Sequence, residues 1–365
     1  MRAPGTQFCK AAAAKAAFTL LEMLVSMSVL ALLLVLVTQL VNSASMVTTQ
    51  STKRLDADNQ ARMLFDRMGT DFARIIQRTD IDTLVDTQNG NDRIFFFSEA
   101  VAYYNSNINR TDKSSVALIG YRVTDQNGDP DNFAPACSLE RFGKGLTWDG
   151  APDPADPLKP GGMVFTPSIS TITSQPNVIA TTWQTDITYT TGGNKYYHVL
   201  TDQVFRMQIC FQVKDTASAS GVAYSNYPVA SKSGVTAASA SAPSSAQAGD
   251  RWYNTNTNRA FIYNAGAWQP NGLKDVLSVV VTIAVLDNKS RQMSSGNLSS
   301  LQTLFPKSTL TGASPKLPAQ VWKTALETAL MTPAASFSST YGIPKAAGSQ
   351  IRIYQRHFPL TTFSK

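Results

Sequence analysis

The run from Ala16 to Val41 is almost entirely apolar, and Glu22 is its only charged residue. A carboxylate inside hydrocarbon is costly, so an acid in such a segment is a functional candidate by default. The 24 residues from Phe18 to Val41 are enough to cross a bilayer as one helix. Glu22 therefore constrains this chain more than any other residue. If the helix lies in a membrane, the charge of this carboxylate needs a compensating partner.

Three basic residues, Arg2, Lys10 and Lys15, precede the run, and residues 1–17 contain no acid. By the positive-inside rule, this bias holds the N-terminus in the cytoplasm. We therefore expect a single pass, with the rest of the chain on the opposite side of the membrane.

An ordinary secretory signal is the alternative explanation of this region. It would use Lys10 and Lys15 as its basic part and Ser43-Ala44-Ser45 as its cleavage site, and the whole apolar helix would be lost. The acid at Glu22 and the length of the apolar run argue against it.

Residues Ala17 to Glu22 read AFTLLE. They resemble the type IV prepilin cleavage motif, in which a prepilin peptidase cuts before FTLxE and methylates the new N-terminus. The resemblance implies processing between Ala17 and Phe18. The freed Phe18 amine would lie one helical turn from Glu22, and the amine of a neighbouring copy could pair with that acid. Ala17 stands where the family usually has glycine, and alanine is small enough for cleavage.

Five further segments carry a second resemblance between residues 95 and 360. They read FFFSEAVAYYN, SSVALIGYRVTD, LERFGKGLTWDG, LSVVVTIAVLDNKSRQM and IRIYQRHFPL. They are similar to the Verru_Chthon cassette protein C group of prepilin-like proteins, and the layout is distantly similar to the larger minor pseudopilins of type II secretion systems. The resemblance implies a structural protein with no enzymatic activity.

The helical pattern continues beyond the apolar run. Ala61, Phe65, Met68 and Phe72 recur at steps of three and four, and no proline occurs from Leu20 to Asp129. We expect one helix from Phe18 to about Arg78, roughly 90 Å long. Its first half suits lipid or other helices, and its second half suits a globular domain packed against it.

The rest of the chain predicts an α+β fold, in which the helix covers one face of an antiparallel sheet and the other face stays polar. The strands are expected from β-branched and aromatic runs: Arg93–Tyr104, Ser115–Thr124, Met163–Phe165, Thr182–Thr190, Lys195–Val199, Val204–Val213 and Val276–Leu286. The first two resemble a hairpin, and Thr191-Gly192-Gly193-Asn194 predicts a hairpin turn between the fourth and fifth.

An insertion interrupts this domain at residues 216–272. Ala217–Ala248 is rich in Ala and Ser and predicts a flexible linker or disordered loop. Trp252–Asn254 and Ala260–Tyr263 predict a small aromatic hairpin, whose rings form either a ligand-facing patch or the hairpin's own core.

The predicted organisation follows in order: a leader (1–17), the helix (18–79, with 18–41 in the membrane), a first β part (93–215), the insertion (216–272) and a last part (273–365). The last part is expected to contain a helix over Pro318–Met331 and a strand over Gln350–Tyr354.

Two cysteines remain if Cys9 leaves with the leader. Cys137 and Cys210 are an even pair in an oxidising compartment, so a disulfide is one expectation. It would close a loop of about 74 residues. Two buried thiols are the other expectation.

Signs of an enzyme, a cofactor or nucleic-acid binding are weak. Only two histidines occur, His198 and His357, and no nucleophile or phosphate-binding motif is present. Three of the +7 charges lie in the leader, so the processed chain carries +4, with no basic cluster. Four side chains at alternating positions suit Ca²⁺, but Pro130 and Ala136 depart from the calcium-loop pattern and favour an ordinary turn. These four are Asp125, Asn127, Asp129 and Asp131.

The sequence thus favours a minor pilin or pseudopilin of the bacterial inner membrane, with a cytoplasmic N-terminus and a periplasmic domain. Its expected partners are prepilin peptidase, other pilin or pseudopilin subunits and the membrane itself. The alternative is a single-pass anchored, adhesin-like protein, in which the insertion serves as a surface-binding module.

Overall fold

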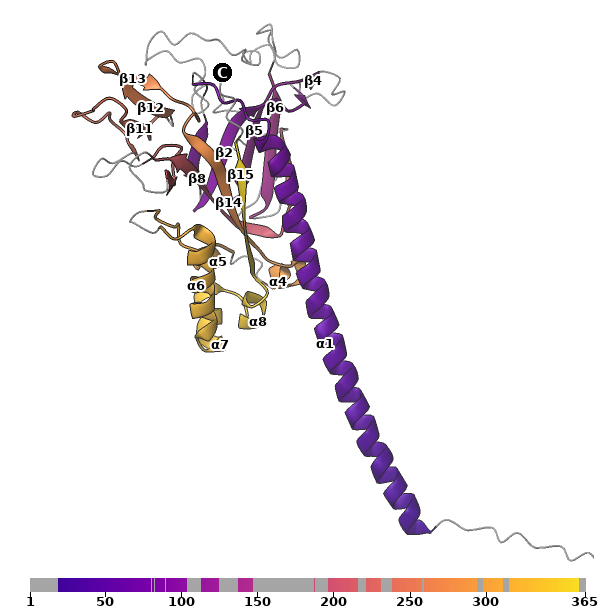
Figure 1. The fold of residues 1–365 in the computed structure, drawn as a ribbon. Helices are drawn as coiled ribbons and strands as arrows, with labels where there is room; N and C mark the ends of the chain where they lie inside the picture. The colour runs from indigo at the N-terminus through magenta and orange to yellow at the C-terminus, as the bar shows by residue number, and fades with distance from the viewer. Residues whose placement is uncertain are drawn as a thin grey trace, which may run out of the picture. The chain divides into compact units, whose positions relative to one another are not determined.

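The computed structural model divides into two compact units, Met1–Leu55 and Asp56–Lys365 (Figure 1). It describes residues 19–79, 81, 83–88, 90–103, 113–124, 137–146, 187, 196–215, 221–230, 238–257, 259–293, 298–310 and 315–360. The expected α+β class is confirmed, with a long N-terminal helix followed by mainly antiparallel strands.

Helix α1 (Leu20–Phe72) is a single helix of 53 residues. It ends six residues before the expected Arg78, because the chain then pairs with a strand. The Ile76 N–H donates to the Phe97 carbonyl, and the Glu99 N–H donates to the Arg74 carbonyl. Backbone groups that pair with a strand in this way cannot also form the hydrogen bonds that would extend the α-helix.

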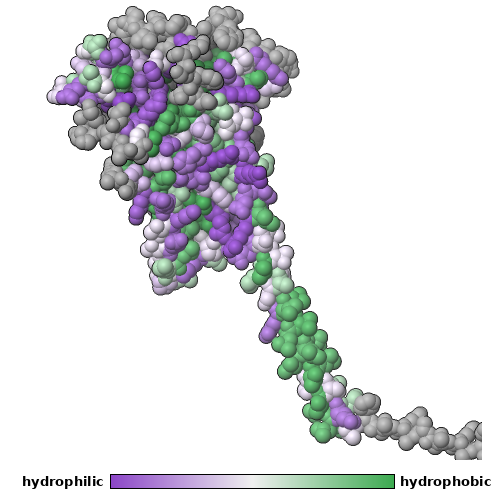
Figure 2. All heavy atoms as spheres, in the orientation of Figure 1, coloured by the Kyte–Doolittle hydropathy of each residue, from purple (hydrophilic) through white to green (hydrophobic). Residues whose placement is uncertain are grey.

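In the first unit, the large apolar side chains of α1 are exposed. Those from Leu20 to Val47 have exposed fractions of 50–83%. The helix is long and apolar enough to cross a membrane by length and composition, and its apolar stretch is green in Figure 2. No other part of the described chain covers these side chains, and an exposed apolar surface of this kind is typical of an interaction or membrane surface.

In the second unit, the same helix buries an apolar face. Ala57, Ala61, Leu64, Phe65, Met68 and Phe72 are all buried. Phe72 stacks on Phe96 with ring centroids 4.8 Å apart and lies 5.1 Å from the ring of Phe358. The predicted helical stripe therefore forms the central part of the domain's core.

The first large sheet has the order β1-β2-β5-β6-β7, with antiparallel neighbours throughout. Its strands are β1 (Leu84–Gln88), β2 (Asn91–Ser98), β5 (Ala117–Val123), β6 (Leu139–Gly145) and β7 (Tyr197–Thr201). The predicted pairing of the first two strands is confirmed by β2 and β5. Their connection contains a small ribbon, β3 (Ala102–Tyr103) and β4 (Lys113–Ser114).

The second large sheet has the order β15-β14-β8-β9 and is also antiparallel. It contains β8 (Val204–Lys214), β9 (Val222–Ser225), β14 (Val276–Val285) and β15 (Arg352–Pro359). The expected strands at Val204–Val213 and Val276–Leu286 are confirmed. The last strand runs five residues beyond the expected end at Tyr354.

Two large sheets replace the single sheet that we expected, and their outer faces are not simply polar. In β2, Ile94 and Phe96 face the core with α1, while Phe95 and Phe97 belong to a second apolar cluster with Phe142. Strand β14 is buried along almost its whole length. The first large sheet therefore buries apolar side chains on both of its faces.

The described part of the insertion contains a sheet of its own. Strands β10 (Ala238–Ser239), β11 (Arg251–Asn254), β12 (Arg259–Asn264) and β13 (Ala267–Pro270) form a third sheet. The predicted aromatic hairpin is confirmed by the antiparallel pairing of β11 with β12. The expected linker also contains β9, which pairs with β8 and so belongs to the second large sheet.

Helix α6 (Pro318–Met331) has the predicted bounds. Short helices α4 (Asn288–Gln292), α5 (Leu298–Gln302), α7 (Ala334–Tyr341) and α8 (Lys345–Gly348) complete the C-terminal part. Of the other expected strands, Met163–Phe165 and all of Thr182–Thr190 except Ile187 lie outside the described residues.

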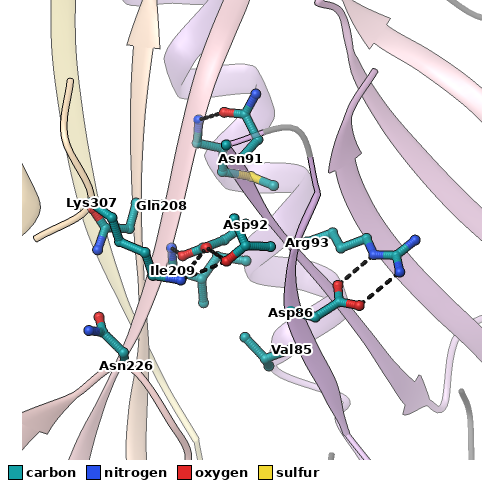
Figure 3. Close-up of polar contacts among 12 residues, drawn as sticks. Val85, Asp86, Asn91, Asp92, Arg93, Gln208, Ile209, Asn226 and Lys307 are labelled. Atoms are coloured by element: carbon teal, nitrogen blue, oxygen red, sulfur yellow. Dashed lines mark hydrogen bonds and ion pairs between the residues drawn. The ribbon is translucent and has the colours of Figure 1, made fainter. Parts of the chain in front are cut away.

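Polar side chains join the two large sheets (Figure 3). Asn91 Oδ1 accepts the Met207 N–H at 2.8 Å, and Asp92 Oδ2 accepts the Ile209 N–H at 3.0 Å. The other Asp92 oxygen accepts from Lys307 Nζ at 2.7 Å. Because Asp92 is buried and fully paired, the start of β2 is fixed against the middle of β8.

Candidate assembly site at the start of the long helix

Thr19 and Glu22 form a closed ring of hydrogen bonds where α1 begins. The Thr19 N–H donates to Glu22 Oε2 at 2.9 Å, and the Thr19 hydroxyl donates to the same oxygen at 3.1 Å. In return, the Glu22 N–H donates to Thr19 Oγ1 at 3.2 Å. This is the capping box, in which the residue before the helix and the third residue within it satisfy each other's N–H groups.

The ring gives Glu22 a role in its own helix as well as its predicted role in assembly. The capping role of Thr19 was not predicted, although Thr-x-x-Glu ahead of an apolar run is a local signal for a helix start. Both of the carboxylate's hydrogen bonds use Oε2. Within the described part of the chain, Oε1 accepts no hydrogen bond and is open to a group from outside.

Several predicted site residues lie outside the described residues. Ala17 and Phe18, on either side of the expected cut, are among them. So are the four candidate Ca²⁺ ligands, Asp125, Asn127, Asp129 and Asp131. Within the described ranges, no three His, Cys, Asp or Glu side chains are grouped to hold a metal.

Cys137 and Cys210 are both buried, and no disulfide joins them in the structure. Gln302 Nε2 contacts Cys137 Sγ at 3.5 Å and the Phe205 carbonyl at 2.8 Å. Phe205 and Cys210 are five residues apart on β8, about 16 Å along a strand. Cys137 therefore lies near the start of β8, and Cys210 lies further along the same strand.

The end of α1 is held by a buried acid. Asp71 Oδ2 accepts from the Tyr121 hydroxyl at 2.5 Å and from Arg141 Nε at 2.6 Å, and Oδ1 accepts from Arg141 Nη2 at 3.0 Å. Burial and the nearby carboxylate raise the pKa of Tyr121 well above its usual value, so its hydroxyl remains a donor. This network ties the helix to β5 and β6. It was not predicted, because Asp71 resembles one more residue of the helix's polar face.

Three more acids on α1 contact the second large sheet or the turn before β8. Asp56 accepts from Gln203 Nε2 at 3.1 Å, and Asp66 pairs with Arg356 at 2.7 Å. Asp58 accepts from the Tyr354 hydroxyl. The second half of α1 is therefore held by polar contacts along its length as well as by its apolar face.

The aromatic rings of the insertion pack mainly on one another. Trp252 stacks on Phe261 with centroids 5.1 Å apart, and Trp268 lies 5.5 Å from Trp252 and 5.2 Å from Tyr263. Trp252 and Phe261 are each only 6% exposed. This arrangement is the hairpin core, the second of the two alternatives that the sequence left open. A ligand-facing role for Trp268 and Tyr263, which are partly exposed, stays a prediction.

The insertion is also fixed to the rest of the domain. The Tyr253 hydroxyl donates to the Val85 carbonyl of β1 at 3.4 Å. Arg251 pairs with Asp275 at 2.5 Å and 3.2 Å, ahead of β14. The insertion is thus an integral part of the second unit.

No profile of a known protein family matches the chain, and no curated protein sequence does. Among solved structures, it is similar to a type IV-like pilin from Thermus thermophilus, with 8% sequence identity and a TM-score of 0.27. The alignment covers 83% of this chain and 94% of that one. At these values the similarity carries no functional argument, which must come from the chain's own residues.

Proposed function

We propose that the protein is a minor pilin- or pseudopilin-type structural subunit. In this proposal, prepilin peptidase cuts between Ala17 and Phe18 and methylates the new N-terminus. The subunit then assembles through α1 into a type IV pilus-like or type II secretion-like envelope filament. The observation that carries the proposal is one unbroken helix, apolar and exposed around a single acid at its start and buried against its own domain at its end.

The exposed half of α1 supports a membrane span that exchanges lipid for other helices. Its apolar side chains are equally satisfied by acyl chains and by neighbouring apolar helices, so moving from membrane to filament need not expose them to water. The domain would lie in the periplasm and the N-terminus in the cytoplasm, as the leader charges predict.

Glu22 would govern the pairing between copies. A lone carboxylate among lipid or packed helices requires a cation, and cleavage would create one at Phe18. Pairing with the amine of a neighbouring copy would then set the axial register of the helices, as one buried polar group does in coiled coils.

Substitution of Glu22 tests this proposal in cells that produce the full chain. Glu22→Ala should insert and lose its leader normally but enter filaments poorly, as measured by cross-linking between copies and by recovery of filaments. Ser26→Ala is a matched control. Ser26 lies one turn further on, and its hydroxyl donates to the Met23 carbonyl of its own helix.

Two results would contradict the proposal. One is incorporation of Glu22→Ala at the wild-type level. The other is filament material whose intact mass shows that residues 1–17 are still attached. A chain that keeps Met1 and forms no filament would favour the anchored surface-binding protein instead.

A further inference from the structure

Arg206 of β8 is a buried cation whose hydrogen bonds all go to neutral groups. Its side chain is only 4% exposed. Nε donates to the Phe305 carbonyl at 3.0 Å, and Nη1 donates to the Gly90 carbonyl and, at 3.3 Å, to Asn91 Oδ1. Within the described ranges, Arg206 forms no ion pair and its Nη2 has no hydrogen-bond acceptor.

Arg141 shows how a buried guanidinium is usually compensated. It contacts both oxygens of Asp71, at 2.6 Å and 3.0 Å. A buried charge is costly unless an opposite charge lies beside it. At Arg206, burial lowers the pKa of the guanidinium, and the attraction of Asp92 offsets only part of this effect. Arg206 thus keeps a positive charge that its surroundings do not balance.

The carboxylate of Asp92 is already used by other groups (Figure 3). Its Oδ1 accepts from Lys307 Nζ at 2.7 Å and from the Thr87 hydroxyl at 2.8 Å, and its Oδ2 accepts the Ile209 N–H at 3.0 Å. Two cations, Lys307 and Arg206, therefore share one acid where β2 meets β8. The contact between the two large sheets carries an excess positive charge.

Hydrogen-bond donors are also in excess at this contact. Asn91 Oδ1 accepts both the Met207 N–H and Arg206 Nη1. Asn91 Nδ2 is buried and has no acceptor among the described residues. Buried polar groups are nearly always paired, and an unpaired one requires an explanation such as a bound water or ion. The missing partner should accept hydrogen bonds, donate none and carry negative charge.

We infer that these residues form a binding site for a small oxyanion, such as phosphate, at the contact between β2 and β8. The anion would accept from Arg206 Nη2 and would also be attracted by Lys307. Gly90 is exposed and the Lys307 side chain is 42% exposed, so the guanidinium lies directly beneath residues that reach the surface. A water molecule would satisfy donors here but would leave the charge unbalanced. The inference does not depend on the proposed function.

The test measures uptake of radiolabelled inorganic phosphate by the full chain in detergent, using equilibrium dialysis at constant sodium chloride. Wild type should show a single saturable site. Arg206→Met keeps an unbranched apolar side chain and removes the guanidinium, so it should bind at least about tenfold more weakly. Arg251→Met is the matched control, because Arg251 already pairs with both oxygens of Asp275. It should bind within about twofold of wild type.

Lys307→Met decides the question if Arg206→Met fails to fold. Its side chain is partly exposed, and its loss leaves one cation facing one carboxylate, so phosphate binding should weaken about fivefold. Three results would overturn the inference. They are the absence of saturable uptake by wild type, wild-type affinity in folded Arg206→Met or in Lys307→Met, and an equal loss in Arg251→Met, which would indicate general attraction to a basic protein.

Discussion

The two halves of α1 are both helical, but they differ in whether their side chains are exposed or buried. In the first half, the Glu22 carboxylate accepts hydrogen bonds from Thr19 alone among the described residues, and every large apolar side chain from Leu20 to Val47 is at least half exposed. In the second half, Met68 and Phe72 are buried and Asp71 is held by two strands. Among the described residues, the first half is thus left uncovered, and the second half is packed in its own domain.

This difference predicts that substitutions in the two halves affect different measurements. Changes near Glu22 should alter assembly without altering the stability of the domain. Changes between Asp56 and Phe72 should alter stability first. The tests below follow the expected size of the effect.

The largest effect is expected from Asp71→Ala. It leaves the Arg141 guanidinium buried without its acid, which costs about 3–5 kcal/mol of unfolding free energy. Denaturant unfolding of the full chain in detergent, followed by fluorescence, measures the loss. Glu22→Ala is the matched acid in the other half and should leave the unfolding curve unchanged. Equal curves for wild type and Asp71→Ala would mean that the network does not hold the helix.

Substitution of one methionine in each half of α1 makes the same comparison for apolar contacts. Met68 is fully buried, so Met68→Ala should cost about 2–5 kcal/mol through lost contacts and a cavity. Met27 is 68% exposed, so Met27→Ala should not change domain unfolding. Similar losses in both variants would show that the first half also packs on the chain's own domain.

Cys210 offers a pH test that reports on the second unit alone. Burial, with a smaller contribution from Asp92, raises the pKa of its thiol to about 12. The unfolded thiol ionises near pH 9 while the folded one keeps its proton, so stability should fall as pH rises from about 9 toward about 12, by about 1.4 kcal/mol per pH unit.

Removing the thiol with Cys210→Ala should remove that part of the pH dependence. Alkylation at pH 9 adds a kinetic measurement: Asp71→Ala should speed the labelling of Cys210, and Glu22→Ala should not. Rapid labelling of the folded wild-type chain would show that the thiol is accessible, contrary to the structure.

The smallest effect is expected from the outer contacts of α1. Asp66 and Arg356 are 59% and 45% exposed, so Asp66→Ala should cost only about 0.2–1 kcal/mol, and less at high salt. The same unfolding assay at two salt concentrations measures it. A loss as large as that of Asp71→Ala would mean that the exposed contacts, and not the buried network, fix the second half of the helix.

Helices and strands with regularly spaced apolar residues were predictable, because the residues that the spacing places on one face are the ones that the structure buries. The helix, β8, β14, α6 and the β11–β12 hairpin follow directly from apolar spacing and turn residues. Strand β6 was missed because its sequence, LERFGKG, is rich in charge. Its Glu140 and Arg141 are buried through pairs with Arg122 and Asp71, which are 18 and 70 residues away. Such long-range compensation leaves no local signal.

The candidate site was predictable only in part. The cost of an acid in an apolar run singled out Glu22, and that argument needs no structure. The contribution of Thr19 depends on where the helix begins, and a boundary of that kind is uncertain by a residue or two from pattern alone. The choice between a disulfide and two thiols required tertiary distances, because the order of residues says nothing about which Cβ atoms meet.

The burial of Cys137 and Cys210 has a practical consequence for locating this subunit in cells. The turn between β12 and β13, at Asn264, Ala265 and Gly266, is exposed. In a chain cleaved before Phe18, which has lost Cys9, a cysteine introduced there as Asn264→Cys would be the accessible thiol, so one maleimide dye or gold particle could be attached to each copy. The same two buried sulfurs that form no bridge would then allow individual subunits to be counted and followed by microscopy.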